Sequence, residues 1–440
     1  MKTLLKSIGP AIIVAAVVLG PGSILTSSKV GASFGIAALP VIFGAAFLMI
    51  GMVALSARLG SVYELSLCQE IAARLGRPIA IAIGLILFTL IALFQSSNNI
   101  ALVGGLEPLL GHGDFSFPIR CIILLAANLF AMGCLALARD LYRSIERLMK
   151  VLIGLMSLAF LANFAIAFIV PKSEGPISDP SQSDWLALLA MVGTTFSVAG
   201  AFYQAYLVRE RGWSIRQLRQ GLLDSVVSIT TLGIVTAVIL LTSWRVFYGS
   251  PMAGSLNSVG DVARQLEPLF GPSARIIFSA GILAGALSSF LINAIIGGTV
   301  LSDALGQGSK LSEKGPVRFS LLALFVGLVV AIASFARQGS VVPLITFAQA
   351  LTVLGIPALA AALIYLGSRK ELVAERRTPR WMLIVAFIGL TVSCILAALT
   401  ARKVYDKIAF GETTNAEMLL VARIPEAPFT SSPQQSPTTA

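Results

Sequence analysis

Gly20-Pro21-Gly22-Ser23 interrupts an uncharged apolar stretch that spans residues 7–28. The proline removes a backbone N–H donor, and the flanking glycines permit dihedral angles that other residues avoid. A helix broken at membrane depth is tolerated where it lines a cavity or is covered by protein, and such breaks mark substrate sites. The four residues therefore predict a binding cavity inside a membrane protein.

A second, weaker break is predicted in the apolar stretch 185–208, around Thr194-Thr195-Phe196-Ser197-Val198-Ala199-Gly200. The two breaks fall in the first and sixth apolar stretches. An inverted repeat of five plus five helices places corresponding helices at these positions, with an eleventh helix added at the end. We therefore expect the two broken helices to face each other across one site.

Composition supports an all-helical integral membrane protein. The hydrophobic fraction is 56%, the charged fraction is 12% and the mean hydropathy is +0.88. Uncharged stretches longer than about 18 residues predict membrane-spanning helices. The eleven predicted helices are 7–28, 30–57, 78–106, 121–138, 151–171, 185–208, 225–244, 276–302, 319–336, 338–368 and 381–401. We expect residues 1–402 to form one membrane transport domain and the Pro-, Ser- and Thr-rich residues 403–440 to be a disordered tail.

The net charge of +11 comes from basic residues that fringe the apolar stretches. With the N-terminus inside, most of the 32 Lys and Arg residues lie on the inner side, so the sequence predicts a cytoplasmic N-terminus and an external C-terminus. The expected surroundings are the lipid bilayer, such as a bacterial inner membrane, and no nucleic acid. The sequence shows no nucleophile–base pair, phosphate loop or metal cluster, so we expect neither an enzyme nor a bound cofactor.

Several short motifs, in order along residues 7–400, resemble the NRAMP family of divalent-metal transporters. The motifs are Gly9-Pro10-Ala11, Pro21-Gly22, Ala57-Arg58-Leu59-Gly60, Arg143-Ser144-Ile145-Glu146-Arg147, Ala284-Gly285-Ala286-Leu287-Ser288-Ser289, Gln349 and Pro357. The resemblance implies a LeuT-type fold, with the substrate site between the first and sixth helices at mid-membrane.

The sequence departs from the family at the residues that carry its chemistry. The family's Asp-Pro-Gly-Asn signature, whose Asp and Asn bind metal, reads Gly20-Pro21-Gly22-Ser23 here. Its Met-Pro-His signature falls on Ser197-Val198-Ala199, and a further histidine falls on Gln204. In the third helix, the family's Asp and Glu fall on Asn98 and Ala101. Metal ligands and proton carriers are thus replaced together.

A site of this composition favours a small anion. A divalent ion that leaves water needs charged or several well-placed ligands, and Mn²⁺ and Fe²⁺ commonly take imidazole or carboxylate. Half-helices that begin near Ser23 and Gly200 would present free N–H groups and positive dipole ends instead. We expect a small inorganic oxyanion, with bicarbonate as the leading candidate. The predicted binding residues are Gly20, Pro21, Gly22, Ser23, Asn98, Thr194, Ser197, Ala199, Gly200 and Gln349.

Other functions stay open at this point. A divalent cation, Mg²⁺ before Mn²⁺ or Fe²⁺, is one alternative, since Mg²⁺ keeps part of its water. A membrane sensor that transports nothing is another. Ser288 and Ser289 lie where LeuT-type folds hold a sodium ion against first-helix carbonyls, so sodium coupling is a further hypothesis.

Overall fold

A computed structural model describes residues 9–110, 115–137, 141–169, 185–250, 256, 260–263, 271–336, 341–372 and 374–421. Within these ranges, side chains are not described at 137, 141–144, 186, 341–352, 374, 403–404 and 406–421. The chain divides into a unit of residues 1–400, which contains the site, and a unit of residues 401–440.

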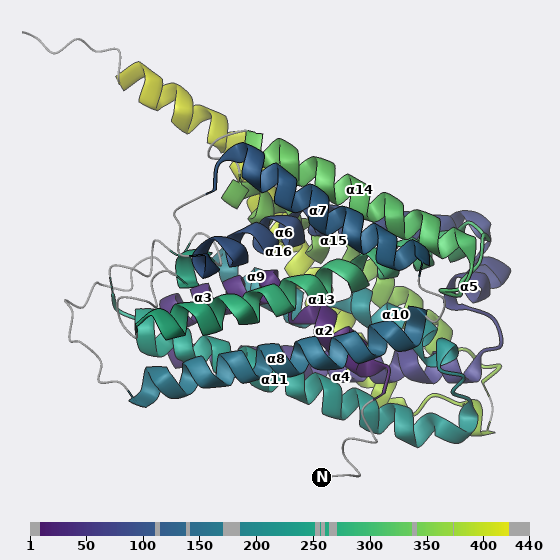
Figure 1. Cartoon of the computed structure of the whole chain (residues 1–440). Coiled ribbons are helices and arrows are strands. Elements are labelled where there is room, and N and C mark those ends of the chain that lie inside the picture. Colours follow the sequence, from purple (N-terminus) through teal and green to yellow (C-terminus); the bar gives the residue numbers. More distant parts are fainter. Residues whose placement is uncertain are drawn as a thin grey trace, which may run out of the picture. The chain divides into compact units, whose positions relative to one another are not determined.

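The structure is helical throughout the described apolar stretches (Figure 1). The helices of the first half are α2 (Ala11–Val18), α3 (Pro21–Phe34), η1 (Gly35–Ala38), α4 (Leu39–Val62), α5 (Leu67–Leu75), α6 (Arg77–Leu109), α7 (Phe117–Leu137) and α8 (Leu141–Ile169). Those of the second half are α9 (Trp185–Thr195), α10 (Val198–Glu210), η2 (Ile215–Gln217), α11 (Leu218–Phe247), α13 (Pro272–Ala304), α14 (Lys314–Ala336), α15 (Val341–Gly367), η4 (Ala374–Arg376) and α16 (Arg380–Val421).

Both predicted breaks are confirmed. The first lies between α2 and α3, where Gly20 is extended (φ −83°, ψ 179°) and Pro21 opens the new helix. Proline suits this first position because its missing N–H would have no partner there. The second lies between α9 and α10, where Ser197 leaves the helical region (φ −79°, ψ 86°). Each broken segment therefore consists of two half-helices joined by a short non-helical link.

Each of the eleven predicted segments is helical within the described residues. Nine candidate spans meet criteria of length and apolarity there, and one of them joins α3 and α4 as Pro21–Val62. Two further segments complete the eleven. The first predicted segment is counted separately from α4, and α15 contains the shorter apolar helix Val353–Gly367. The all-helical prediction with two broken helices is confirmed.

Two predicted boundaries were wrong. The first segment was expected to end at 28, but α3 continues to Phe34 and ends at Gly35, whose φ of +61° is accessible to glycine. Lys29 thus lies within a helix and not at its end. The tail was expected to be disordered over 403–440, but α16 is helical to Val421, and residues 422–440 lie outside the described residues. The sequence 403–421 contains helix-forming Lys, Ala, Glu and Leu residues and no proline, so the helix continues.

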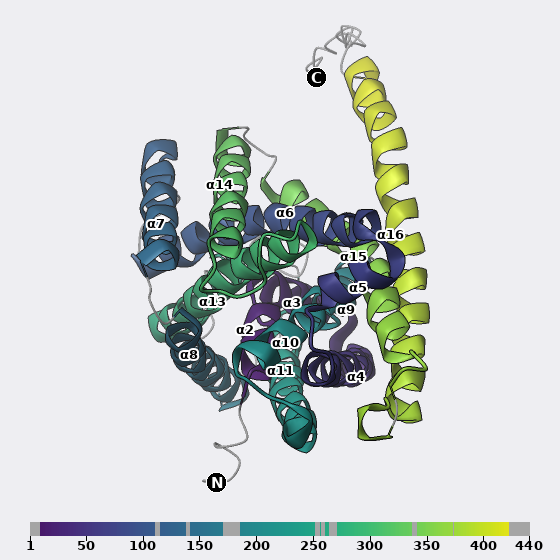
Figure 2. The same cartoon turned by 90° about the vertical axis from the view of Figure 1, so that its right-hand side faces the viewer.

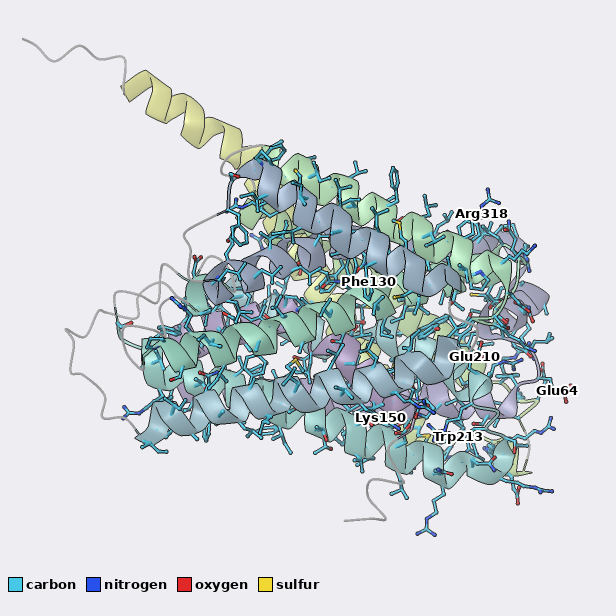
Figure 3. All side chains as sticks on the ribbon, viewed as in Figure 1. Glu64, Phe130, Lys150, Glu210, Trp213 and Arg318 are labelled. Atoms are coloured by element: carbon cyan, nitrogen blue, oxygen red, sulfur yellow. The ribbon has the colours of Figure 1, made fainter. Side chains whose placement is uncertain are left out.

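The half-helices occupy the centre of the 1–400 unit. Figures 1 and 2 both place α2 and α10 between α4, α8, α11 and α13. All eight residues of α2 are buried, whereas Phe130 on the outer helix α7 is 72% exposed, as expected for a side chain that faces lipid. Figure 3 shows Phe130 along the middle of the bundle and the charged Glu64, Glu210 and Arg318 toward its right-hand end.

Asp224 caps the N-terminal end of α2. Its carboxylate, buried on α11, accepts hydrogen bonds from Gly9 N–H (2.6 Å) and Ala11 N–H (2.8 Å). Ser228 adds a third donor at 3.3 Å. The first N–H groups of a helix have no intrahelical partner, so a carboxylate there satisfies them and opposes the helix dipole.

Replacing Asp224 with Ala should therefore destabilise the protein. Two buried N–H groups would lose a charged acceptor, which costs about 3 kcal/mol. We expect a lower midpoint of thermal unfolding in detergent, whereas Glu64→Ala, at an exposed position, should leave the midpoint unchanged. An unchanged midpoint for Asp224→Ala would show that solvent caps α2 equally well.

Candidate functional site

A central cavity of about 50 Å³ lies where the two breaks meet. It is bounded by α2, α3, α9 and α10 and closed by α6, α13 and α15. All of its lining residues are uncharged. Its polar side chains are Ser23, Thr194, Ser197 and Asn293. A space of this size can hold a few water molecules or a small ion.

Four carbonyl groups in the last turn of α2 have donors within hydrogen-bond distance. Unpaired carbonyls at a helix C-terminus are the groups that would ligate a cation in such a break. Here the carbonyls of four consecutive residues each accept a hydrogen bond. The pairs are Leu19 N to Ala15 O (3.0 Å), Ser288 Oγ to Ala16 O (3.1 Å), Ser289 Oγ to Val17 O (2.8 Å) and Ser23 Oγ to Val18 O.

The N-terminal ends of the opposing half-helices are not capped. Gly20 and Ser197 are the N-cap residues of α3 and α10, and neither supplies a side-chain cap. The N–H groups of the first turn have no partner inside a helix, so Gly22, Ser23 and the residues 198–200 present N–H groups at the break. Together they give this part of the cavity a positive potential.

The structure brings four of the predicted site residues to the cavity: Ser23, Thr194, Ser197 and Ala199. The glycines act instead through close approach. A Cβ at Gly20 would overlap Ser289 Oγ, and a Cβ at Gly200 would lie 3.1 Å from Val14 Cγ1. Pro21 and Gly22 form the first turn of α3. The side chain of Gln349 lies outside the described residues.

Asn98 does not line the cavity. It lies one turn beyond the lining residue Phe94 on α6, and its Nδ2 donates to Gln95 Oε1 at 2.7 Å. Gln95 in turn donates to Phe290 O on α13 at 2.7 Å, so this polar chain joins two helices. Asn98 Oδ1 is buried without a partner. The geometry thus connects Asn98 to helix packing, and its predicted role in binding stays a prediction.

Asn293 is a cavity residue that was not predicted from the sequence. This asparagine lines the cavity from α13 and is 2% exposed. It lies in the predicted segment 276–302, close to Ser288 and Ser289, but the family motifs did not single it out. The available signal was its amide in an otherwise apolar run, which indicates an interhelical hydrogen bond as readily as a ligand.

A second polar cluster lies at the far end of α10. Asp303, buried at the end of α13, accepts hydrogen bonds from Ser66 Oγ and Tyr206 Oη, both at 2.7 Å. Tyr206 lies eight residues after Val198, so the cluster is about 12 Å along the helix from the cavity. On the same helix, Arg209 donates hydrogen bonds to the backbone carbonyls of residues 63–65, which follow α4.

Tyr63 lies directly after α4, and burial raises the pKa of its hydroxyl to about 12.

A family model described as natural resistance-associated macrophage protein-like matches residues 11–402. The chain belongs to this family. The NRAMP resemblance drawn from the motifs is thereby confirmed, and the match covers both breaks and the helices that surround the cavity.

Curated relatives align over most of their length. The divalent metal cation transporter MntH of Verminephrobacter eiseniae is 23% identical over 417 residues, covering 90% of this chain and 88% of the relative. The MntH of Listeria welshimeri is 25% identical over 407 residues, covering 88% and 87%. The identity is low, so it leaves room for a changed substrate site within the NRAMP fold.

Solved structures confirm the fold. The Eremococcus coleocola manganese transporter has a TM-score of 0.76 at 21% identity, covering 96% of this chain and 91% of that one. MhsT, solved with L-phenylalanine, has a TM-score of 0.57 at 15% identity, covering 89% and 98%. The nucleobase-cation-symport-1 transporter Mhp1 has a TM-score of 0.53. The expected LeuT-type architecture is therefore confirmed.

Within this NRAMP fold, the described residues contain no group of three or more His, Cys, Asp or Glu side chains placed to hold a metal ion. Ser288 and Ser289 do reach the first broken helix, as the sodium hypothesis requires. Ser289 Oγ, however, donates to Val17 O at 2.8 Å, and Ser288 Oγ lies 3.1 Å from Ala16 O and 2.9 Å from Gly285 O on its own helix. A sodium ion would have to replace these hydrogen bonds.

Proposed function

We propose that this NRAMP-family membrane transporter carries a small inorganic oxyanion, with bicarbonate as the leading candidate, in place of a transition metal. The observation that carries the proposal is the asymmetry of the first break. The carbonyls of residues 15–18, at the C-terminal end of α2, have hydrogen-bond donors within reach, whereas the N-cap residue of α3, on the N–H side, supplies no side-chain cap. An ion bound at the start of α3 would face N–H donors, and N–H donors bind anions.

The energetics favour the same reading. Uncapped helix N-termini bind anionic groups through free N–H groups and the helix dipole. A divalent cation in this cavity would lose hydration worth several kcal/mol per charge against uncharged side chains. It would also have to displace the hydroxyl protons that cover the α2 carbonyls. The relatives named as metal transporters share the fold with this chain but align at low identity.

The position of the basic residues supports the proposed orientation. Arg58 and Arg74 contact the segment 371–377, and Arg209 contacts residues 63–65, so these basic groups gather at one end of the bundle. We place that end on the cytoplasmic side.

The test is uptake into proteoliposomes that contain a pH-sensitive dye, with imposed gradients of bicarbonate, Mn²⁺ or Mg²⁺. We expect alkalinisation of the lumen with bicarbonate and no metal-dependent signal. Repeating the assay with choline in place of sodium decides whether sodium is coupled. Metal entry without a bicarbonate response would return the protein to the divalent-cation transporters, and no response to any ion would favour a sensor.

One substitution connects the flux to the cavity. Ser23→Phe should abolish bicarbonate uptake, because the ring fills a cavity of about 50 Å³. The matched control is Gly44→Phe, which adds the same ring at an exposed position of α4 where no atom lies within 4 Å of an added Cβ. Equal uptake by the two variants would place the transport path elsewhere.

A further inference from the structure

Asn293 differs from the other buried asparagines among the described residues. Asn98, Asn99, Asn128 and Asn163 each donate their side-chain amide to a protein acceptor at 2.6–3.2 Å. The side-chain nitrogen of Asn293 has no such partner, although the residue is 2% exposed. A buried polar group without a partner is costly, and a turn of the amide about its last side-chain bond would bring this nitrogen to the cavity, where a ligand accepts its hydrogen bond.

The surroundings of Asn293 determine which end of its amide a ligand meets. The nitrogen and oxygen exchange places by a turn about the last side-chain bond, so the amide alone could serve a cation or an anion. It shares the cavity with Ser23 and Ser197, the residues at the uncapped starts of α3 and α10. A ligand that already accepts N–H groups from two half-helices requires a further donor from α13.

We propose that Asn293 donates its amide to one oxygen of the transported oxyanion and thereby determines selectivity for an anion over a cation. This inference rests on the proposed function and adds a third element to the site. Donors from α3, α10 and α13 converge on one small cavity from three directions. A planar anion with three oxygens meets all three, with one oxygen toward each element.

The charge of the side chain at position 293 should determine which ion the cavity accepts. The α6 residues that line the cavity, Leu90, Ile91 and Phe94, are all apolar. Among the lining residues from α6 and α13, Asn293 is the one with a polar side chain. A carboxylate at the same position would reverse the sign of the site while keeping the shape of the side chain.

The experiment measures the concentration dependence of bicarbonate uptake in proteoliposomes for the wild type and three variants. Asn293→Ala should raise KM about tenfold with little change in the maximal rate, because one ligand contact is lost. Asn293→Asp should reduce bicarbonate uptake at least a hundredfold and introduce Mn²⁺ binding, measured by calorimetry. The matched control is Asn163→Ala, which removes an equally buried amide that bonds its own helix on α8 and lies outside the cavity lining.

The outcomes separate this inference from the proposed function. If the wild type carries bicarbonate and Asn293→Ala keeps its KM, the inference is wrong and the proposed function stands. If the wild type carries no bicarbonate, both fail. A purely structural role would lower the amount of folded protein and the maximal rate without moving KM. If Asn293→Asp does not fold, the KM of Asn293→Ala decides.

Discussion

Gly20→Ala should reduce bicarbonate uptake about a hundredfold. The added methyl group would overlap Ser289 Oγ and lie 3.0 Å from Ser289 Cβ, so the hydroxyl must leave Val17 O or the break must move away from α13. Either change uncovers a carbonyl beside the anion or displaces the N–H groups of α3. Displacement of a reacting or binding group by about 1 Å reduces rates by about this factor.

The control for Gly20→Ala is the same change at Gly44, where an added Cβ has no atom within 4 Å. Both variants exchange one glycine for alanine in a membrane segment, so differences in expression or insertion are matched. Initial uptake rates at equal protein per vesicle are the measurement. Full uptake by Gly20→Ala would show that Ser289 rotates away without consequence, and the proposed covering of the α2 carbonyls would then be unnecessary for transport.

Asp303→Ala should expose the region around the C-terminal end of α10 to solvent. This is the end of α10 that lies away from the cavity. The change leaves Ser66 and Tyr206 without their acceptor in a buried place, at a cost of about 2–4 kcal/mol. Cys68 reports the opening, because it lies in the same buried region. Burial raises the pKa of the Cys68 thiol, so the wild-type residue should resist alkylating reagents.

The labelling is done in a background that lacks Cys121, Cys134 and Cys394. We expect slow modification of Cys68 in that background and fast modification after Asp303→Ala. Tyr206→Phe removes only one of the two hydrogen bonds and should give an intermediate rate. If the three rates are equal, Asp303 does not hold this end closed.

The sequence predicted the elements that depend on local chemistry. Pro21 between two glycines placed the first break correctly, because proline and glycine act on their own backbone. Long uncharged runs placed the helices, because the bilayer sets their length. The weaker break around Ser197 was also placed correctly, although its residues are poor helix breakers.

The details of the site depend on contacts that sequence order does not reveal. Ser289 meets Val17 across 272 positions of chain, so its part in covering the carbonyls of α2 could not be predicted from spacing. Asn293 and Asn98 carry the same amide, yet Asn98 donates to Gln95 on its own helix whereas the side-chain nitrogen of Asn293 has no acceptor, and composition does not distinguish the two. The extension of α16 to Val421 was missed because composition marks the end of an apolar run and not the end of a helix.

The uncharged lining of the cavity also gives the transport cycle an electrical direction. A carrier with a neutral site carries no charge there when empty and one negative charge when a monovalent oxyanion occupies it. One charge that crosses a potential of 100 mV changes in free energy by about 2.3 kcal/mol, which corresponds to roughly a 40-fold concentration ratio. Reorientation of the loaded carrier is then the step that responds to voltage. For the proposed oxyanion, an inside-negative membrane would oppose entry, so accumulation would require a cation carried with it.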